Sequence, residues 1–126
     1  MNPRQSRSRI ASFGHAIAGL GHVLRTQRNA WIHSVASLAV ILLAIWLQLS
    51  LTHWALLFLA MAMVWMAEFV NSALEATVDL ASPTVHPLAK VGKDVGAAAV
   101  LIAAACAALV GFVILGPPLA QRLWGG

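Results

Sequence analysis

Three apolar stretches, at about residues 32–51, 54–78 and 94–115, most constrain what this chain of 126 residues can fold into. Each is close to the roughly 20 residues that a helix needs to cross the hydrocarbon core of a membrane. The composition agrees, because 60% of the residues are hydrophobic and only 10% are charged. Soluble domains average about 25% charged residues. We therefore expect an all-α integral membrane protein with three spans.

The segment ahead of the first span, residues 9–28, has a different pattern. Its apolar side chains recur at spacings of three and four, which is typical of one face of a helix. They are Ile10, Phe13, Ile17, Leu20, Val23 and Leu24. This pattern predicts an amphipathic helix that lies on the membrane surface. We expect residues 1–8 to form a disordered tail, and residues 119–126 a C-terminal tail beyond the stop at Gly116–Pro118.

Basic residues are distributed unequally around the predicted spans. Arg25 and Arg28 precede the first span, while the break expected at Ser50–His53 has no Lys or Arg. Lys90 and Lys93 lie in the loop expected over residues 79–93. Because cytoplasmic loops carry an excess of Lys and Arg, we expect the N-terminus and this loop in the cytoplasm. The net charge of +4 suits anionic lipid headgroups better than nucleic acid.

All four carboxylates lie between Glu68 and Asp94. On a helix, the polar residues of the second span would form one stripe within about 100° of arc. This stripe consists of Glu68, Asn71, Ser72, Glu75 and Asp79. The amide and the hydroxyl alone would suit helix packing. A charged side chain costs roughly 2.5–3.5 kcal/mol at the centre of a membrane helix, so the two glutamates favour a functional site.

The residue types in this region are those that phosphoryl transfer requires. Carboxylate and amide oxygens suit Mg²⁺, and a further carboxylate can act as a general base toward a hydroxyl. Lys90 and Lys93 can hold phosphates. A lipid hydroxyl would meet a water-soluble phosphate donor at the depth of this stripe. The sequence has neither a Gly-rich phosphate loop nor the protein-kinase motifs, so such a site would be of another kind.

Two other classes of function stay open at this point. A small proton or ion pathway would use the glutamates as relays, but the half of the span between Trp54 and Glu68 is apolar. A non-catalytic assembly subunit would leave the lysines of the loop without a role. His33 and His53 are expected as polar groups at the two ends of the first span, and Trp65 as a packing residue.

Two stretches resemble the small prokaryotic diacylglycerol kinase family. Residues 68–79 have the pattern Glu-x-x-Asn-Ser-x-x-Glu-x-x-x-Asp, and residues 86–94 read His-Pro-Leu-Ala-Lys-Val-Gly-Lys-Asp. The second stretch most resembles the undecaprenol kinase branch. The match covers about residues 9–115, which implies a single membrane kinase domain over residues 9–118.

This resemblance also implies an activity and an assembly. The protein would be a homotrimer in the bacterial inner membrane, with composite active sites at the cytoplasmic surface. MgATP would be the phosphate donor, so Mg²⁺ is the expected cofactor. The acceptor would be a membrane lipid alcohol, either diacylglycerol or undecaprenol.

The resemblance further implies roles for individual residues. Glu68 matches the catalytic base, and Glu75 a metal-coordinating glutamate. Asn71, Ser72, Asp79 and Lys90 would support the site. The positions that match or lie near nucleotide contacts are Lys93, Asp94, His86, Glu75, Arg9 and His15. Gln27 stands where many members carry a second metal-binding glutamate: either its amide oxygen binds the metal, more weakly, or one metal is held differently.

Overall fold

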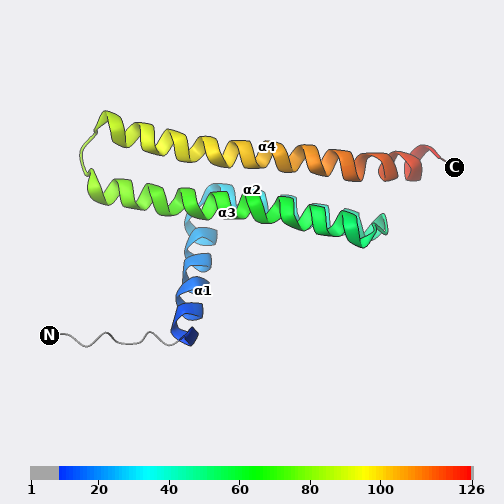
Figure 1. Cartoon of the computed structure of the whole chain (residues 1–126), viewed down its shortest axis with the longest axis horizontal. Coiled ribbons are helices and arrows are strands. Elements are labelled where there is room, and N and C mark those ends of the chain that lie inside the picture. The colour runs from blue at the N-terminus through cyan, green and yellow to red at the C-terminus, as the bar shows by residue number, and fades with distance from the viewer. Residues whose placement is uncertain (1–8, 126) are drawn as a thin grey trace.

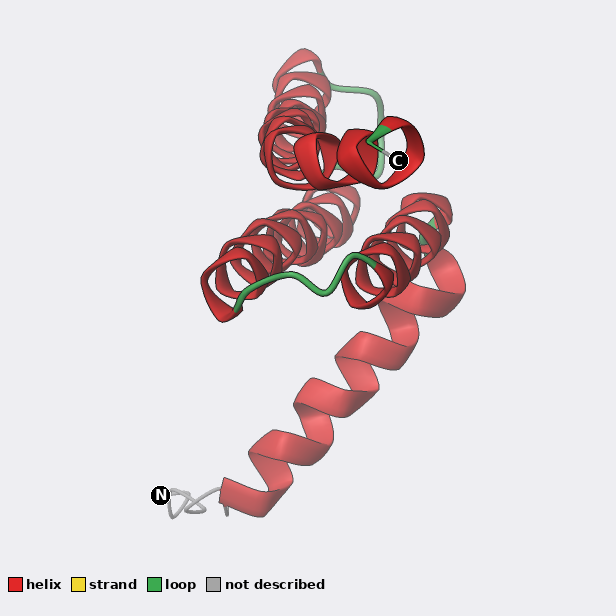
Figure 2. Ribbon diagram, turned by 90° about the vertical axis from the view of Figure 1, so that its right-hand side faces the viewer, coloured by secondary structure: helices red, strands yellow, loops and turns green. Residues whose placement is uncertain are grey.

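The structure is a computed structural model that describes residues 9–125, with side chains from residue 11 onward. It has four helices: α1 (Arg9–Thr26), α2 (Arg28–Trp46), α3 (Leu51–Ala81) and α4 (Pro87–Trp124). The helices α2, α3 and α4 run side by side, and α1 runs across them (Figures 1 and 2). The all-α prediction is confirmed. The expected disorder of residues 1–8 and the side chain of Arg9 lie outside the described residues.

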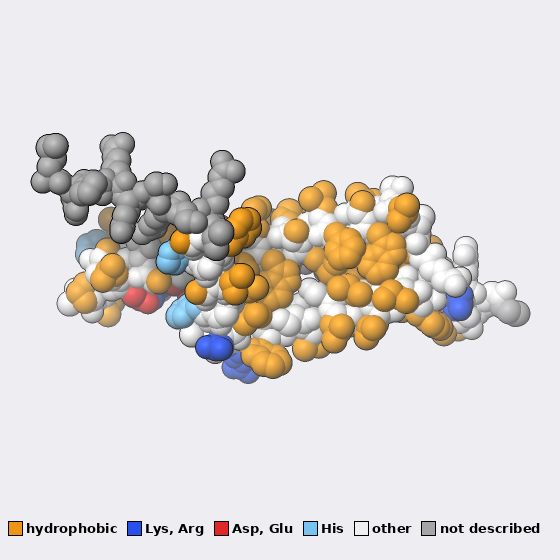
Figure 3. All heavy atoms as spheres, turned by 90° about the horizontal axis from the view of Figure 1, so that it is seen from below, with side chains coloured by type: hydrophobic (Ala, Val, Ile, Leu, Met, Phe, Trp, Pro, Cys, Tyr) orange, Lys and Arg blue, Asp and Glu red, His pale blue; other side chains and the backbone are white. Residues whose placement is uncertain are grey.

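Three helices in the described part of the chain are long and apolar enough to cross a membrane. These are α2, α3 and α4, with mean hydropathy values of 1.7, 1.7 and 2.8 over their most apolar 18 residues. Many of their large apolar side chains point outward, including Leu38, Leu59 and Phe112. Figure 3 shows such side chains over the middle of the molecule and charged ones toward its ends. Apolar surface on this scale requires lipid or another protein against it.

The connection between the first two spans lies about one helical turn earlier in the chain than the sequence predicted. α2 ends at Trp46, and Gln48 then takes a left-handed backbone conformation with φ of 55°, which commonly ends a helix. Ser50 is the N-cap of α3, and its hydroxyl accepts a hydrogen bond from the His53 N–H at 3.4 Å. The predicted break at Ser50–His53 is therefore wrong, because residues 51–53 already form the first turn of α3.

The connection between α3 and α4 is shorter than the loop predicted over residues 79–93. His86 is the N-cap of α4, and its Nδ1 accepts a hydrogen bond from the Leu88 N–H at 3.2 Å. Pro87 follows at the first helical position, where a missing N–H costs nothing. The short loop therefore places Lys90, Lys93 and Asp94 on the first turns of a helix.

α4 continues to Trp124, so the predicted stop at Gly116–Pro118 is wrong. The φ angle of proline suits a helix, although each proline removes one backbone hydrogen bond. Contacts beyond the prolines compensate for this loss. Leu119 packs against the buried cluster that contains Leu57 and Leu115, and the Arg122 guanidinium lies 5.2 Å from the ring centroid of Trp46.

Small residues allow the closest helix pairing in the bundle. α4 packs most extensively against α3, and its residues Gly96, Val100 and Ala103 are buried. Small side chains let membrane helices approach each other closely. This pairing places the first turns of α4 beside the polar end of α3, where the candidate site lies.

Candidate functional site

The polar stripe of α3 runs from the interior of the bundle to its surface. Glu68 is only 1% exposed, and Asn71 and Ser72 are also buried. Glu75 is half-buried and Asp79 is exposed. The stripe predicted from the sequence therefore has a buried carboxylate at one end and an accessible one at the other.

Asn71 is held in a fixed orientation by two neighbours. Its Nδ2 donates a hydrogen bond to Glu75 Oε1 at 3.1 Å. A Cβ atom at position 96 would collide with Asn71 Oδ1, so the glycine of α4 is what leaves room for this oxygen. The oxygen itself is buried and has no hydrogen-bond partner among the described residues. Since buried polar atoms are normally paired, Asn71 Oδ1 is a candidate acceptor for a ligand once the surrounding side chains give access to it.

Ser72 is less available than Asn71. Its hydroxyl donates a hydrogen bond to the Glu68 carbonyl oxygen at 2.8 Å, within its own helix. This bond satisfies the buried hydroxyl locally. Ser72 therefore contributes to the structure of the site rather than presenting a free group to a ligand.

Two ion pairs lie at the surface end of the site. Lys93 Nζ is 2.5 Å from Asp79 Oδ1, which joins α4 to α3, and Lys90 Nζ is 2.6 Å from Asp94 Oδ2. Both lysines precede the apolar stretch of α4. Their hydrogen bonds to these carboxylates raise the pKa of Lys93 and the pKa of Lys90, which favours the charged form of each lysine. Exposed pairs contribute little to stability, so the lysines can exchange a carboxylate for a phosphate.

The same lysines line a hollow of about 340 Å³ between the ends of α3 and α4. The structure brings five of the predicted site residues together there, namely Asp79, His86, Lys90, Lys93 and Asp94. His15 is exposed on α1 and is not among the residues that line this hollow. Gln27 is the N-cap of α2, and its side chain makes no capping hydrogen bond.

Few groups in one chain can hold a metal ion. Within the described residues, no three His, Cys, Asp or Glu side chains gather into a metal-binding cluster. Mg²⁺ needs fewer protein ligands, because it usually keeps water and takes one or two carboxylates together with phosphate oxygens. The Glu75 carboxylate and the unpaired Asn71 Oδ1 are hard oxygen donors that fit this requirement.

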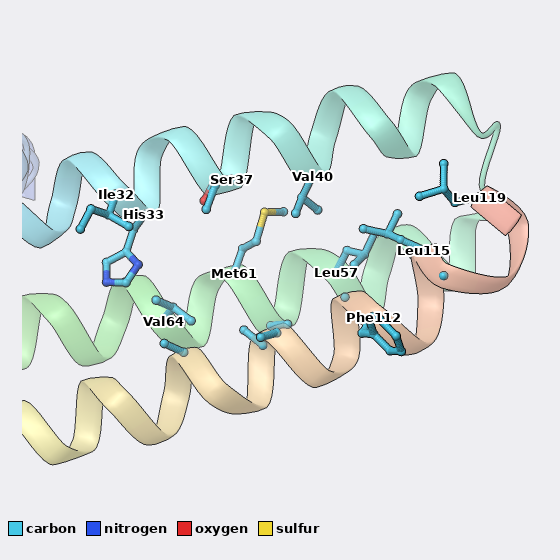
Figure 4. Close-up of a pocket in the computed structure, with 17 residues that line it drawn as sticks. Ile32, His33, Ser37, Val40, Leu57, Met61, Val64, Phe112, Leu115 and Leu119 are labelled. Carbon is cyan, nitrogen blue, oxygen red and sulfur yellow. The ribbon is translucent and has the colours of Figure 1, made fainter. Parts of the chain in front are cut away.

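A second, larger cavity of about 550 Å³ runs between α2, α3 and α4. Its lining is almost entirely apolar, with His33 toward one end and Leu119 toward the other (Figure 4). His33 Nε2 also lies 3.7 Å from Glu68 Oε2. The carboxylate therefore lies between a hydrophobic groove and the polar end of the bundle.

Reasoning from the sequence did not place His33 beside Glu68. Counted from the Leu47–Ser50 connection, Glu68 lies about one helical turn farther along α3 than His33 lies along α2. In an antiparallel helix pair, the connection, correctly located, could therefore have placed His33 within about one turn of Glu68, close to Trp65, but not in contact with the carboxylate. His33 was expected only as an interfacial polar group, so its position beside the carboxylate was not predicted.

The fold and the site define a small multi-pass membrane protein with a buried carboxylate at the inner end of a polar stripe and a cationic hollow at its outer end. A model of the prokaryotic diacylglycerol kinase family matches residues 14–115. This protein therefore belongs to that family, as the motif resemblance predicted.

Individual relatives cover most of the chain. The undecaprenol kinase of Bacillus subtilis is 38% identical over 108 residues, which are 86% of this chain and 88% of the relative. The diacylglycerol kinase of Escherichia coli K12 is 34% identical over 110 residues, which cover 82% of this chain and 90% of the relative. The diacylglycerol kinase of Synechocystis is 43% identical over 111 residues, covering 87% of this chain and 63% of its own length.

Proposed function

We propose that this protein is an ATP-dependent lipid kinase that phosphorylates the hydroxyl of a membrane lipid alcohol. The observation that carries the proposal is the buried Glu68 carboxylate: it lies next to His33, which lines the apolar groove, and it begins the polar stripe that ends at Asp79 in the cationic hollow. The family match and the names of the relatives, undecaprenol kinase and diacylglycerol kinase, support a lipid kinase. Diacylglycerol and undecaprenol are the two candidate acceptors.

Glu68 is the proposed general base. Its carboxylate would accept the proton of the lipid hydroxyl while the hydroxyl oxygen forms its bond to the γ-phosphorus of ATP and the bond to ADP breaks. Glu75 and Asn71 would hold Mg²⁺, which supplies positive charge against the phosphate oxygens when it is bound. Ser72 would keep its local structural role.

The hollow at the start of α4 is the proposed nucleotide site. Lys93 would leave Asp79 and balance the negative charge of the transferring phosphoryl group. His86, Lys90 and Asp94 line the same hollow and would contact the nucleotide. Arg9 and His15 would contribute from α1.

The proposed assembly is a homotrimer in the bacterial inner membrane, with the site and the N-terminus on the cytoplasmic side. The arginines and lysines near this end of the bundle support that orientation. α1 would lie on the membrane surface, because it runs across the spans (Figure 1) and its Phe13 and Ile17 side chains are 72% and 68% exposed. The exposed apolar faces of the three spans leave room for neighbouring subunits, which would complete the sites.

A direct assay tests the proposal. The purified protein in vesicles, supplied with ATP and Mg²⁺, should form a phosphorylated lipid from diacylglycerol or from undecaprenol, and the two acceptors should be compared side by side. No product from either acceptor would overturn the proposed function. The alternative, a small proton or ion pathway, has less support because the cavity next to Glu68 is lined by apolar side chains.

Replacing Lys93 with methionine should raise the KM for ATP more than the same change at Lys90. Lys93 joins α4 to the polar stripe of α3, whereas Lys90 is 76% exposed and pairs within its own helix. We expect an increase of about 10- to 100-fold for Lys93→Met, as for a lost charge-assisted contact. Steady-state kinetics with varied ATP measure it, and equal effects of the two variants would contradict the assignment.

Replacing Gln27 with glutamate tests whether position 27 contributes to the metal site. If the Gln27 amide oxygen lies at the metal, a carboxylate there should lower the Mg²⁺ concentration needed for half-maximal activity, because Mg²⁺ prefers charged oxygen ligands. A titration of activity against Mg²⁺ measures this effect. An unchanged titration would remove Gln27 as a ligand.

A further inference from the structure

His33 and Glu68 approach each other in the interior of the bundle from two different helices. His33 Nε2 on α2 lies 3.7 Å from Glu68 Oε2 on α3, with the side chains 15% and 1% exposed. Both atoms are buried and neither has a hydrogen-bond partner among the described residues. Two unsatisfied polar groups are therefore neighbours, and one of them belongs to the proposed base.

A buried acceptor or donor without a partner costs about 1–3 kcal/mol, and more when the group is charged. A separation of 3.7 Å is longer than a hydrogen bond. However, catalytic hydrogen bonds are often long in the free enzyme and tighten when the substrate is bound. A small shift of either side chain would pair Nε2–H with the carboxylate and satisfy both groups.

The imidazole of His33 is held in place by its surroundings. Its ring packs edge-on against Trp65, with centroids 6.2 Å apart and an angle of 69° between the planes. Trp65 in turn donates a hydrogen bond from Nε1 to Ser37 Oγ at 3.3 Å. Ser37 lies one turn after His33 on α2, and Trp65 one turn before Glu68 on α3. These contacts join α2 and α3 at the level of the carboxylate and orient the ring before any ligand binds.

His33 also lies where the apolar groove approaches the carboxylate. Figure 4 shows its ring between α2 and α3, on the side of the groove that is opposite to Leu119. A hydroxyl at this end of the groove would meet Glu68 and His33 together. The ring can therefore control which carboxylate oxygen faces the hydroxyl.

We propose that His33 is a positioning residue for Glu68: its Nε2–H donates to one carboxylate oxygen and holds the other toward the lipid hydroxyl. This inference rests on the proposed role of Glu68 as the base. It also gives Trp65 and Ser37 a role in the site, since they fix the ring that positions the carboxylate.

Kinetics of three variants test the inference. His33→Phe keeps a ring against Trp65 but cannot donate, and kcat should fall about 10- to 100-fold, as expected for a lost hydrogen bond to a charged group. The KM for ATP should not change. His33→Gln can donate from its side-chain amide and should restore kcat to within about threefold of the wild type. His53→Phe is the matched control, because His53 is exposed in the first turn of α3.

A second readout does not depend on activity. Glu68 and Glu75 are the two glutamates of the sequence. Glutamate labelled with ¹³C at the side-chain carboxyl carbon therefore gives two NMR signals, and the signal that disappears in Glu68→Gln belongs to Glu68. His33→Phe should move the Glu68 signal and leave the Glu75 signal in place. If His33→Phe does not fold, His33→Leu provides the same comparison.

The two readouts separate the inference from the function on which it rests. An unmoved Glu68 signal, or an unchanged kcat in a folded His33→Phe variant, would overturn the positioning role while the lipid kinase assignment stands. If the wild type phosphorylates no lipid, the proposed function fails, and the Glu68 signal still decides whether His33 contacts this carboxylate.

Discussion

Replacing Glu68 with glutamine should reduce kcat for lipid phosphorylation by about 10²- to 10⁴-fold, the range expected when a general base is lost. Glutamine has nearly the same shape as glutamate but cannot accept the hydroxyl proton. Glu68 is 1% exposed, and removal of an incompletely paired buried carboxylate is not expected to destabilise the protein. The loss should therefore appear in activity and not in assembly.

The measurement combines a lipid kinase assay with thermal denaturation and gel filtration in detergent. Ser72→Ala is the matched control, because the Ser72 hydroxyl is buried next to Glu68 but bonds only to a carbonyl of its own helix. This control should keep kcat within about threefold of the wild type, because it removes only a local hydrogen bond between a side chain and the backbone. A folded Glu68→Gln variant with more than about a tenth of wild-type activity would exclude Glu68 as the base.

Replacing Gly96 with alanine should damage both the stability and the activity of the protein. The added Cβ would overlap Asn71 Oδ1 and lie 3.1 Å from Leu74 Cδ2. Overpacking of a tight contact typically costs about 1–3 kcal/mol. Relief of the overlap requires either that α4 moves away from α3 or that Asn71 turns out of its hydrogen bond with Glu75. Either movement disturbs the proposed metal ligands.

We expect a lower denaturation temperature for Gly96→Ala, together with a higher Mg²⁺ requirement for activity. Gly92→Ala is the control one turn away on α4, because its Cβ would make only an ordinary contact with Val78 at 3.7 Å. If Gly96→Ala resembles Gly92→Ala, the close approach of α4 to Asn71 does not matter for the site.

Several features of the protein were predictable because they depend on local sequence. Three spans are predicted by the length and hydropathy of the apolar stretches, and α2, α3 and α4 are long and apolar enough to be these spans. The polar stripe follows from the helical period, which places Glu68, Asn71 and Glu75 on one face whatever the partner helices are. The family, too, was recognised from motifs within residues 68–94 and is confirmed by the match over residues 14–115.

The errors at helix ends have local physical causes. The break between the first two spans was predicted at Ser50–His53, but Gln48 takes the left-handed conformation and Ser50 caps the next helix. The predicted stop at Gly116–Pro118 overlooked the packing of Leu119 and Arg122, which keeps α4 helical beyond its prolines. Residue propensities do not contain these tertiary contacts.

The sequence by itself thus determined which polar side chains lie together on one helix, since spacing on a helix fixes which side chains share a face. The contacts between helices were decided only by the tertiary structure. His33 reaches Glu68, Gly96 makes room for Asn71, and Lys93 pairs with Asp79. Each of these contacts depends on which helices are neighbours and on the position of each helix along the axis of the other. That relative position is set by the packing of small and large side chains along the whole bundle.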